Sequence, residues 1–178
     1  MAKALILHGG AGTWRYLKRR EKAVETVKNC TSRAWRVLVE KNNALEAVVE
    51  AIRCMEDSGY LNAGWGSALD LFGERGLDAG IMASNGLLGA VGDVKATRNA
   101  ILLARIVAEE TPHILVVSGG ADRLARDKNL PPLPPPPDHS LTIYREFIKQ
   151  LVKGEAPRPY IVDTREFLEK NPVLQSFM

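Results

Sequence analysis

The chain has 178 residues, of which 46% are hydrophobic, a length that suits one hydrophobic core better than two independent domains. Its 24 basic and 21 acidic residues give a formal net charge of +3, and neither sign forms a long block. The composition therefore excludes a basic nucleic-acid-binding arm and an acidic tail. We expect one unit over residues 1–178 that binds no nucleic acid.

The sequence also gives expectations about compartment and redox state. No apolar stretch approaches the roughly 20 residues that a bilayer-spanning helix needs. Met1 to Lys3 lead directly into a strand-like run, without the apolar region and small-residue cleavage site of a signal peptide. Cys30 and Cys54 lack CxxC spacing and fall in stretches with helical periodicity, which favours buried free thiols over a disulfide or a metal site. We expect a cytoplasmic protein without a membrane partner.

The first elements are predicted to be a strand and two helices. The apolar run from Ala4 to Leu7 enters a glycine cluster, which is typical of a strand that leads into a tight loop. Residues 16–40 carry apolar side chains three and four positions apart, and this spacing predicts a helix with one buried face. Asn43 and Glu46 have the spacing of a capping box at the start of a second helix, which Gly59 ends.

The middle of the chain is predicted to form a hairpin followed by helices and one further strand. Two short apolar runs, at residues 77–82 and 87–91, are joined by Ser84-Asn85-Gly86. Asn99 is predicted to cap a helix over residues 100–110, before a strand at 113–118 and a short helix at 121–128. Adjacent hairpin strands favour an α/β fold with mixed or antiparallel pairing over a chain of βαβ units.

The last part of the chain is rich in proline. Residues 130–140 cannot form a helix or a central strand, because proline lacks an N–H donor and has a fixed φ. We expect an extended polyproline spacer on the surface, and a PxxP ligand for an SH3-type partner is the alternative. Residues 141–153 are predicted to form an amphipathic helix, and the weak periodicity of residues 154–178 predicts a loosely ordered tail.

The first glycine cluster matches neither of the common nucleotide-binding motifs. Gly9, Gly10 and Gly12 do not have the GxGxxG spacing, and no Gly-Lys-Ser/Thr follows them. A tight turn is therefore favoured over a phosphate-binding loop, because glycine adopts positive φ without strain.

The second glycine cluster, around Trp65, leaves two interpretations open. Alternate glycines at positions 64 and 66 would allow the chain to aim several carbonyls inward, around a monovalent cation, or to place Asn62 in a cleft. The other interpretation is a turn at the end of a helix, with Trp65 in the core. His8, His113 and His139 show no metal-binding spacing, and no nucleophile is evident.

Five segments, in order, resemble the plant-type asparaginase and isoaspartyl peptidase family of N-terminal nucleophile hydrolases. They are HGGAGT at 8–13, ALEAVVEAIRCMED at 44–57, LNAGWGS at 61–67, GLDAGIM at 76–82 and RNAILLARIVAEETPHILVVSGGADRLAR at 98–126. Each motif is weak by itself, but the ordered set is specific. The resemblance implies a four-layer αββα sandwich that a partner chain completes.

The same resemblance implies an activity and a partner. In this family a precursor cleaves itself, and the threonine that then begins the β chain is the nucleophile, with its own α-amino group as base. The chain is thus similar to an α chain whose partner is the β chain of the same precursor, in an (αβ)2 heterotetramer. The implied substrates are the side-chain amide of L-asparagine, isoaspartyl dipeptides or both, and the implied catalysis needs no cofactor.

The resemblance also implies three sets of site residues. Asn62 matches an asparagine that lies beside the nucleophile, and His8, Gly9 and Gly10 match a loop near the bond cleaved in self-processing. The backbone carbonyls that match a structural sodium site belong to Met55, Glu56, Ser58, Leu61, Ala63 and Trp65. The alternative from a different class is a non-catalytic α/β protein that binds a small molecule through its glycine-rich loop.

Overall fold

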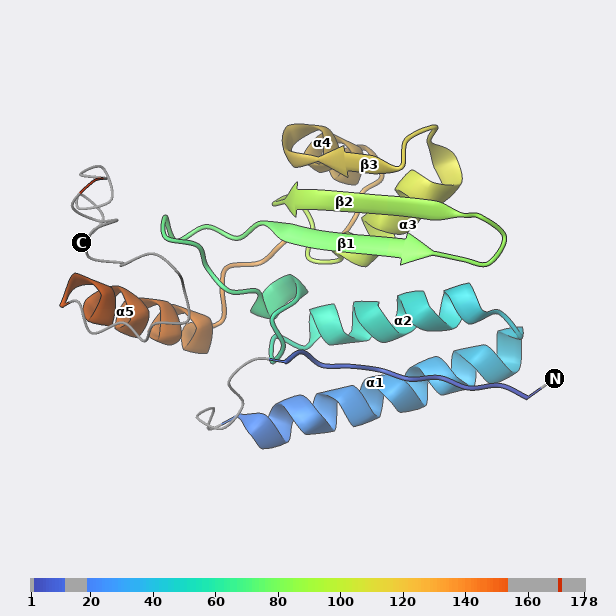
Figure 1. The fold of residues 1–178 in the computed structure, drawn as a ribbon, viewed down its shortest axis with the longest axis horizontal. Helices are drawn as coiled ribbons and strands as arrows, with labels where there is room; N and C mark the ends of the chain where they lie inside the picture. Colours follow the sequence, from blue (N-terminus) through green and yellow to red (C-terminus); the bar gives the residue numbers. More distant parts are fainter. Residues whose placement is uncertain (1, 12–18, 154–169, 171–178) are drawn as a thin grey trace.

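The computed structural model describes residues 2–11, 19–153 and 170, which form a mixed α/β fold (Figure 1). In chain order the elements are α1 (Arg20–Lys41), α2 (Ala44–Asp57), the short 3-10 helix η2 (Gly64–Gly66), β1 (Leu77–Met82), β2 (Leu88–Val94), α3 (Ala100–Glu110), β3 (Leu115–Val117), α4 (Ser118–Asp127) and α5 (Asp138–Val152). Within the described residues, no helix is both long enough and apolar enough to cross a membrane.

The sheet has the mixed pairing that the hairpin predicted. Its order is β1-β2-β3, with β1 and β2 antiparallel and β2 and β3 parallel. The turn between β1 and β2 is closed by a hydrogen bond from the Ala83 N–H to the Leu87 carbonyl oxygen, 2.9 Å. Gly86 supplies the positive φ of 87° that the turn requires. The predicted hairpin is confirmed.

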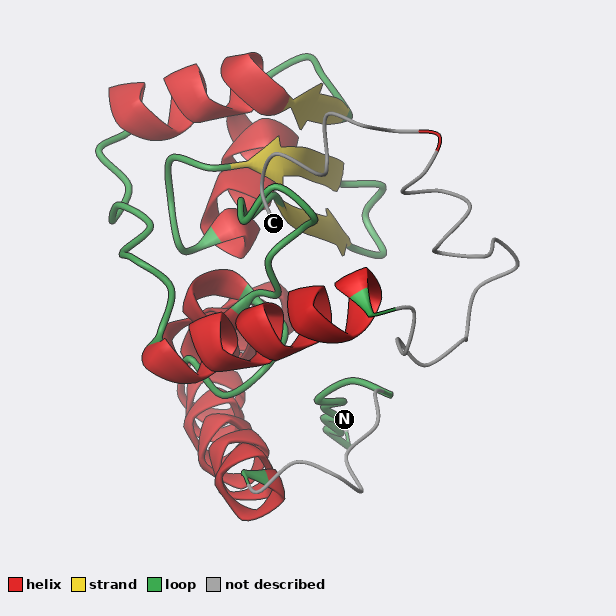
Figure 2. Cartoon of the chain, turned by 90° about the vertical axis from the view of Figure 1, so that its left-hand side faces the viewer, coloured by secondary structure: helices red, strands yellow, loops and turns green. Residues whose placement is uncertain are grey.

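The main core lies between the sheet and the helices behind it. In Figures 1 and 2, α3 and α4 cover the same face of the sheet. The buried side chains of this core are Val49, Leu77, Ile81, Val91, Val94, Ala100, Ile101, Leu103, Ala104, Val107, Ala121 and Ala125. A Cβ atom on Gly89 would lie 2.5 Å from the Ala104 carbonyl oxygen, so only glycine allows β2 to lie this close to α3.

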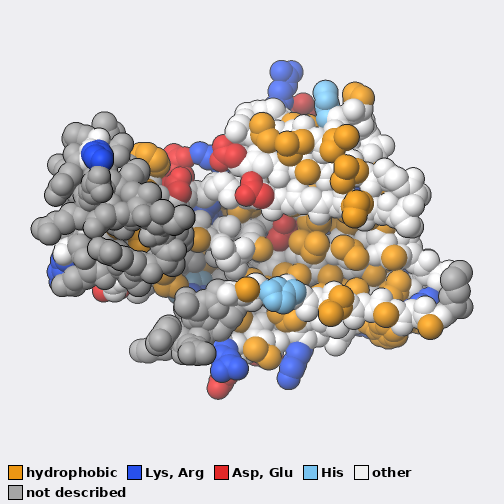
Figure 3. Space-filling view, viewed as in Figure 1, with side chains coloured by type: hydrophobic (Ala, Val, Ile, Leu, Met, Phe, Trp, Pro, Cys, Tyr) orange, Lys and Arg blue, Asp and Glu red, His pale blue; other side chains and the backbone are white. Residues whose placement is uncertain are grey.

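The opposite face of the sheet is open and apolar. Figure 3 shows hydrophobic side chains gathered over this face and along the N-terminal segment in front of the helices. Met82 is 80% exposed, and Leu88, Leu115 and Val117 are exposed beside it. A sheet with an uncovered apolar face of this kind marks a surface for a further layer.

The predicted N-terminal strand does not form within this chain. Residues 2–11 run in an extended path along α1 and α2 (Figure 1), but they belong to no strand of the described sheet. Their side chains nevertheless alternate, with Leu5 and Leu7 half-buried and Ile6 94% exposed. The alternation of side chains that the sequence predicts is therefore present, but the segment does not join the described sheet as a strand.

The prediction of free thiols is wrong, because Cys30 on α1 and Cys54 on α2 form a disulfide, with their Cα atoms 5.6 Å apart. Both residues do lie on predicted helices. The two cysteines are equally far along the chain from Asn42, which has the left-handed φ of 50° at the end of α1. An antiparallel helical hairpin that turns at this point brings them opposite each other.

The predicted helix boundaries are partly confirmed. The Asn43 side chain accepts a hydrogen bond from the Glu46 N–H at 3.1 Å, which is the predicted cap of α2, and Gly59 follows with φ 72°. Asn99 precedes α3 as expected, but its side chain makes no capping hydrogen bond. Helix α4 begins at Ser118, earlier than predicted, so Gly119 and Gly120 form part of its first turn.

The proline-rich segment is extended as predicted, but it is half-buried and packs against the rest of the fold. Leu130 and Leu133 pack against the main core. The Pro131 carbonyl oxygen accepts hydrogen bonds from Thr97 Oγ1 at 2.7 Å and from the Arg98 N–H at 3.2 Å. Helix α5 begins at Asp138, within the predicted spacer. Of the tail at 154–178, only residue 170 lies within the described residues.

The disulfide leads to a stability prediction. Reduction should lower the free energy of unfolding by about 3 kcal/mol, because it releases a loop of 24 residues that the bond closes in the unfolded chain. Urea unfolding of the full-length protein with and without dithiothreitol measures this difference. The matched control is the double variant Cys30→Ser, Cys54→Ser, whose midpoint should not respond to dithiothreitol. Two free thiols in the denatured, unreduced protein would contradict the pairing.

Candidate functional site

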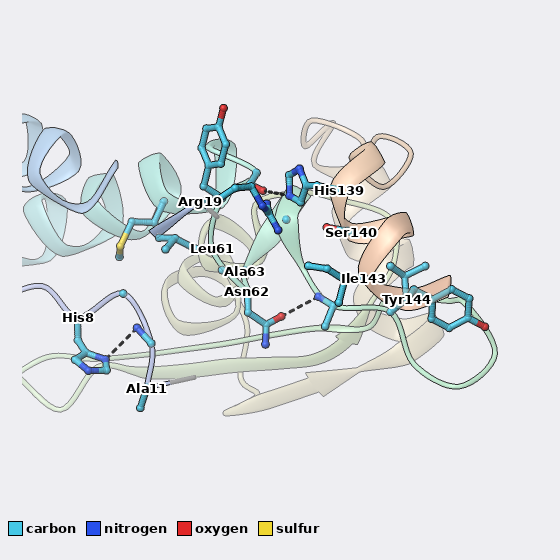
Figure 4. Close-up of a pocket in the computed structure, with 18 of the residues that line it drawn as sticks. His8, Ala11, Arg19, Leu61, Asn62, Ala63, His139, Ser140, Ile143 and Tyr144 are labelled. Carbon is cyan, nitrogen blue, oxygen red and sulfur yellow. Dashed lines mark hydrogen bonds between the residues drawn. The ribbon is translucent and has the colours of Figure 1, made fainter. Parts of the chain in front are cut away.

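A cavity of about 690 Å³ lies between the N-terminal loop, the loop after α2 and one face of α5 (Figure 4). Its lining includes His8, Gly9, Gly10, Ala11, Arg19, Tyr60, Leu61, Asn62, Ala63, His139, Ser140, Ile143, Tyr144 and Phe147. The cavity therefore brings together two of the predicted sets of site residues, which are far apart in the sequence.

The first predicted set, His8 to Gly10, forms a tight turn at the cavity. His8 Nδ1 accepts a hydrogen bond from the Gly10 N–H at 3.2 Å, and Gly10 has a φ of 106°. Added at Gly9, a Cβ atom would lie 2.8 Å from Val27 Cγ2 on α1. The glycines thus allow a tight turn and close packing against α1, which is the interpretation that the sequence favoured over a phosphate-binding loop.

Asn62 is held in the cavity wall by its own loop. Its Oδ1 atom accepts a hydrogen bond from the Ala68 N–H at 2.8 Å, drawn in Figure 4. That bond fixes the orientation of the amide, and Asn62 Nδ2 has no partner among the described residues. The side chain is exposed, so this N–H2 group is available to a ligand in the cavity.

The loop that carries Asn62 folds back tightly on itself and on the end of α2. A Cβ atom on Gly64 would lie 2.6 Å from the Glu56 carbonyl oxygen, and one on Gly66 would lie 2.4 Å from the Leu61 carbonyl oxygen. Gly64 also has a φ of 54°. Both positions therefore require glycine, because a side chain there would collide with the backbone that folds back against it.

These carbonyls suit a hard monovalent cation, with one exception. Backbone oxygens are the ligand type that such ions prefer, and no side-chain charge is needed at these positions. The Met55 carbonyl oxygen accepts two hydrogen bonds from Ser58, one from its backbone N–H at 3.2 Å and one from Oγ at 2.7 Å. These two bonds keep the start of the loop compact. The Trp65 carbonyl oxygen instead lies 2.9 Å from Arg75 Nη1, whose positive charge disfavours a cation there.

Trp65 and Arg75 fasten the proline-rich segment to this loop. Trp65 Nε1 donates to the Pro135 carbonyl oxygen at 3.0 Å, and Arg75 Nη2 donates to that of Pro134. Because Arg75 also donates to Trp65, one guanidinium joins the loop to the proline-rich segment. The ring of Trp65 lies against Gly59, where a Cβ atom would come within 2.9 Å of Trp65 Cε3. Trp65 is partly exposed and not a core residue.

Helix α5 is attached to the same loop by two side chains. His139 Nε2 donates to the Gly59 carbonyl oxygen at 2.9 Å, and Tyr144 donates its hydroxyl to the Leu71 carbonyl oxygen at 3.1 Å. Burial, and then the positive charge of Arg19, lower the pKa of His139. A neutral imidazole with its proton on Nε2 fits this hydrogen bond.

Glu56 has a structural role that the sequence did not predict. Its side chain is 3% exposed, and Oε1 accepts a hydrogen bond from the Ile101 N–H in the first turn of α3 at 3.1 Å. Asn99, which was predicted to cap this helix, instead donates Nδ2 to Asp57 at 3.0 Å. Burial raises the pKa of Glu56 to about 7. Glu56 therefore caps α3 from the end of α2.

A sequence signal for Glu56 did exist. It continues the apolar stripe of α2 four positions after Ile52 and seven after Val49, so helical spacing alone predicts that it is buried. A buried acid needs hydrogen-bond donors, and the N-terminus of a neighbouring helix provides them. The contacts of Arg75 and His139 had no such signal, because both residues bond to backbone carbonyls distant in the sequence.

The model of the family described as asparaginase matches residues 1–164 of this chain. The chain belongs to the asparaginase family. Among the described residues, the two sets that the family resemblance assigned to the site, Asn62 and the turn from His8 to Gly10, meet at the one cavity of Figure 4.

Curated members of the asparaginase family match over most of this chain. A plant-type L-asparaginase of Pyrococcus horikoshii is 40% identical over 153 residues, which cover 85% of this chain and 50% of the relative. An isoaspartyl peptidase/L-asparaginase of Mus musculus is 33% identical over 131 residues, covering 73% and 40%. One of Danio rerio is 36% identical over 135 residues, covering 75% and 43%. The chain thus spans about half the length of the curated relatives it matches.

The hydrogen bonds of Arg75 lead to a second stability prediction. Arg75→Ala should lower the free energy of unfolding by about 2 kcal/mol, because it leaves the carbonyls of Trp65 and Pro134 without their donor. The control is Arg36→Ala, since Arg36 is exposed on α1, and its effect should stay within about 0.5 kcal/mol. Urea unfolding of the full-length proteins measures both. Equal effects of the two substitutions would show that Arg75 does not hold the proline-rich segment.

Proposed function

We propose that the complete protein is a threonine-dependent amidohydrolase of the N-terminal nucleophile type. It hydrolyses the side-chain amide of L-asparagine to aspartate and ammonia, or cleaves isoaspartyl dipeptides, or both. The observation that carries this proposal is the meeting of Asn62 and the His8–Gly10 turn at one cavity, in a chain of the asparaginase family. Relatives named L-asparaginase and isoaspartyl peptidase support it.

The proposed reaction is an acyl transfer in two steps. The hydroxyl of a threonine at the start of the β chain attacks the side-chain carbonyl, while its α-amino group takes the hydroxyl proton. The C–N bond breaks, the proton passes to the leaving amine, and an ester to the threonine remains. Water then hydrolyses this ester, which releases aspartate and regenerates the threonine. In this chain Asn62 Nδ2 donates a hydrogen bond that positions the threonine or the substrate.

The proposed β chain comes from the same precursor, and two αβ units form an (αβ)2 heterotetramer. Two surfaces support a partner: the open apolar face of the sheet and the extended segment at residues 2–11, which belongs to no strand of the described sheet. A second sheet on that face, covered by its own helices, would complete a four-layer αββα sandwich. The turn at His8, Gly9 and Gly10 is the proposed autoprocessing loop, since its glycines allow the tight backbone there. We place the assembled enzyme in the cytoplasm.

A structural sodium ion is the second part of the proposal. The residues that would hold it through backbone carbonyls are Met55, Glu56, Ser58, Leu61 and Ala63, together with Trp65 if Arg75 moves away. The ion would fix the conformation of the loop that carries Asn62 and take no part in the chemistry. The close packing of the Glu56 and Leu61 carbonyls against Gly64 and Gly66 supports this assignment.

Ammonia release from asparagine tests the activity. Asn62→Ala should lower kcat/KM by about 100-fold, the order observed when one positioned hydrogen-bond donor is removed from an active site. Asn62→Asp keeps the oxygen that binds Ala68 and replaces the Nδ2 donor with a charged carboxylate oxygen, so it should show a loss at least as large with an intact fold. Asn29→Ala, on an exposed position of α1, is the control and should leave kcat/KM unchanged.

The outcomes separate the two classes of function. Mass spectrometry of the purified full-length protein should find two chains, the second beginning with threonine. An uncleaved protein without ammonia release, which still binds asparagine, would favour the non-catalytic binding protein. Unchanged kcat/KM in both Asn62 variants would remove this residue from the site.

Sodium should raise the melting temperature of the assembled protein above that in lithium at equal ionic strength. A gain of about 1 kcal/mol, expected at a sodium concentration several times the dissociation constant, corresponds to a shift of roughly 2–4 °C. Calorimetry in the two chloride salts measures it. Identical melting in both salts would exclude a sodium-selective site.

A further inference from the structure

Arg19 is unusual among the arginines of the described residues. Those that are partly buried are Arg19, Arg53, Arg75, Arg98 and Arg105. Four of these have partners within 3.0 Å: Arg53 has Glu50 and Asp57, Arg75 has the Trp65 carbonyl oxygen, Arg98 has Asp57, and Arg105 has Glu46. The Arg19 side chain has no hydrogen bond and no ion pair within the part of the chain that the structure describes, whereas its backbone carbonyl accepts a hydrogen bond from the Ala23 N–H.

The position of Arg19 makes this lack of a partner informative. It immediately precedes α1, and its side chain lines the cavity beside His139 (Figure 4). Burial of the guanidinium lowers its pKa, and the neighbouring Tyr60 offsets part of this effect. His139 cannot supply an anion, and its ring donates to the Gly59 carbonyl oxygen. A partly desolvated guanidinium facing a cavity is a site for a carboxylate.

Asn62 connects this site to the proposed reaction. It lines the same cavity as Arg19, from the loop after α2, while Arg19 comes from the start of α1. The volume of about 690 Å³ is in the range of sites that enclose drug-sized ligands and is ample for a dipeptide.

The two proposed substrates differ in the group that leaves. Asparagine releases ammonia, which has no carboxylate. An isoaspartyl dipeptide releases an amino acid. The free α-carboxylate of that amino acid lies one residue beyond the carbonyl that is attacked. Only the dipeptide therefore has a second carboxylate on the leaving side of the bond that breaks.

We propose that Arg19 binds the C-terminal carboxylate of the leaving residue and so favours isoaspartyl dipeptides as substrates. This inference rests on the proposed function and adds a substrate preference to it. The guanidinium binds the carboxylate through charge-assisted hydrogen bonds, and the wide cavity toward Ile143 and Phe147 on α5 receives the side chain of the leaving residue.

The test compares three substrates of the full-length protein: asparagine, isoaspartyl-leucine and isoaspartyl-leucine amide, in which the terminal carboxylate is blocked. The wild-type protein should prefer the free dipeptide over its amide by about 10- to 100-fold in kcat/KM, the factor for a hydrogen bond to a charged group. Arg19→Gln should remove this preference and leave kcat/KM for asparagine within about twofold. Arg20→Gln, the exposed neighbour, is the matched control and should behave as wild type.

The other outcomes overturn the inference. An equal loss on asparagine and on the dipeptide in Arg19→Gln would mean that Arg19 supports the cavity wall or binds a group common to both substrates. An unchanged preference for the free dipeptide would place its carboxylate elsewhere. If the wild-type protein hydrolyses none of the three, the proposed function fails, and calorimetric binding of isoaspartyl-leucine and its amide to wild type and Arg19→Gln still decides the role of Arg19.

Discussion

The return of the backbone between Gly59 and Gly66 is the constraint on which the rest of the site depends. Side chains cannot fit at Gly64 and Gly66, because carbonyl oxygens of Glu56 and Leu61 occupy the space where a Cβ atom would lie. A loop this tight must also satisfy its backbone carbonyls. Arg75 and His139 donate to the carbonyls of Trp65 and Gly59, and Tyr144 donates to that of Leu71, shortly after the loop. The position of Asn62 is thus the result of contacts made by the whole loop.

Local rules in the sequence predicted most of the secondary structure. Helical spacing located α1 and α2, and the capping pair Asn43 and Glu46 marked the start of α2. The turn at Asn85-Gly86 predicted the hairpin. Each of these depends on residues close together in the chain. The prediction of an N-terminal strand was wrong. A strand requires hydrogen bonds to a neighbouring strand, and residues 2–11 belong to no strand of the described sheet.

The site was predictable to the extent that it depends on motifs. Asn62 and His8 meet at one cavity although 54 positions separate them in the sequence and no common helix or strand joins them. The motifs assigned both residues to the site, whereas the residues that support them had no local signal. Cys30 and Cys54 pair because α1 and α2 turn at Asn42, and Glu56 caps α3 because the end of α2 lies against its first turn. Such contacts between distant segments follow from packing, which the periodicity of a single segment does not encode.

The proline-rich segment has a chemical asymmetry that explains its place in the fold. The prolines offer carbonyl oxygens to their surroundings and no N–H groups, so every backbone hydrogen bond that a proline makes is an accepted one. Donors on other elements, such as Trp65, Arg75 and Thr97, hold the segment at the carbonyls of Pro135, Pro134 and Pro131. The fixed φ angles also mean that little chain entropy is lost when it is held. The prolines of the segment are thus a rigid row of hydrogen-bond acceptors, and replacing Pro131, Pro134 or Pro135 by another residue would add a backbone donor that needs its own partner.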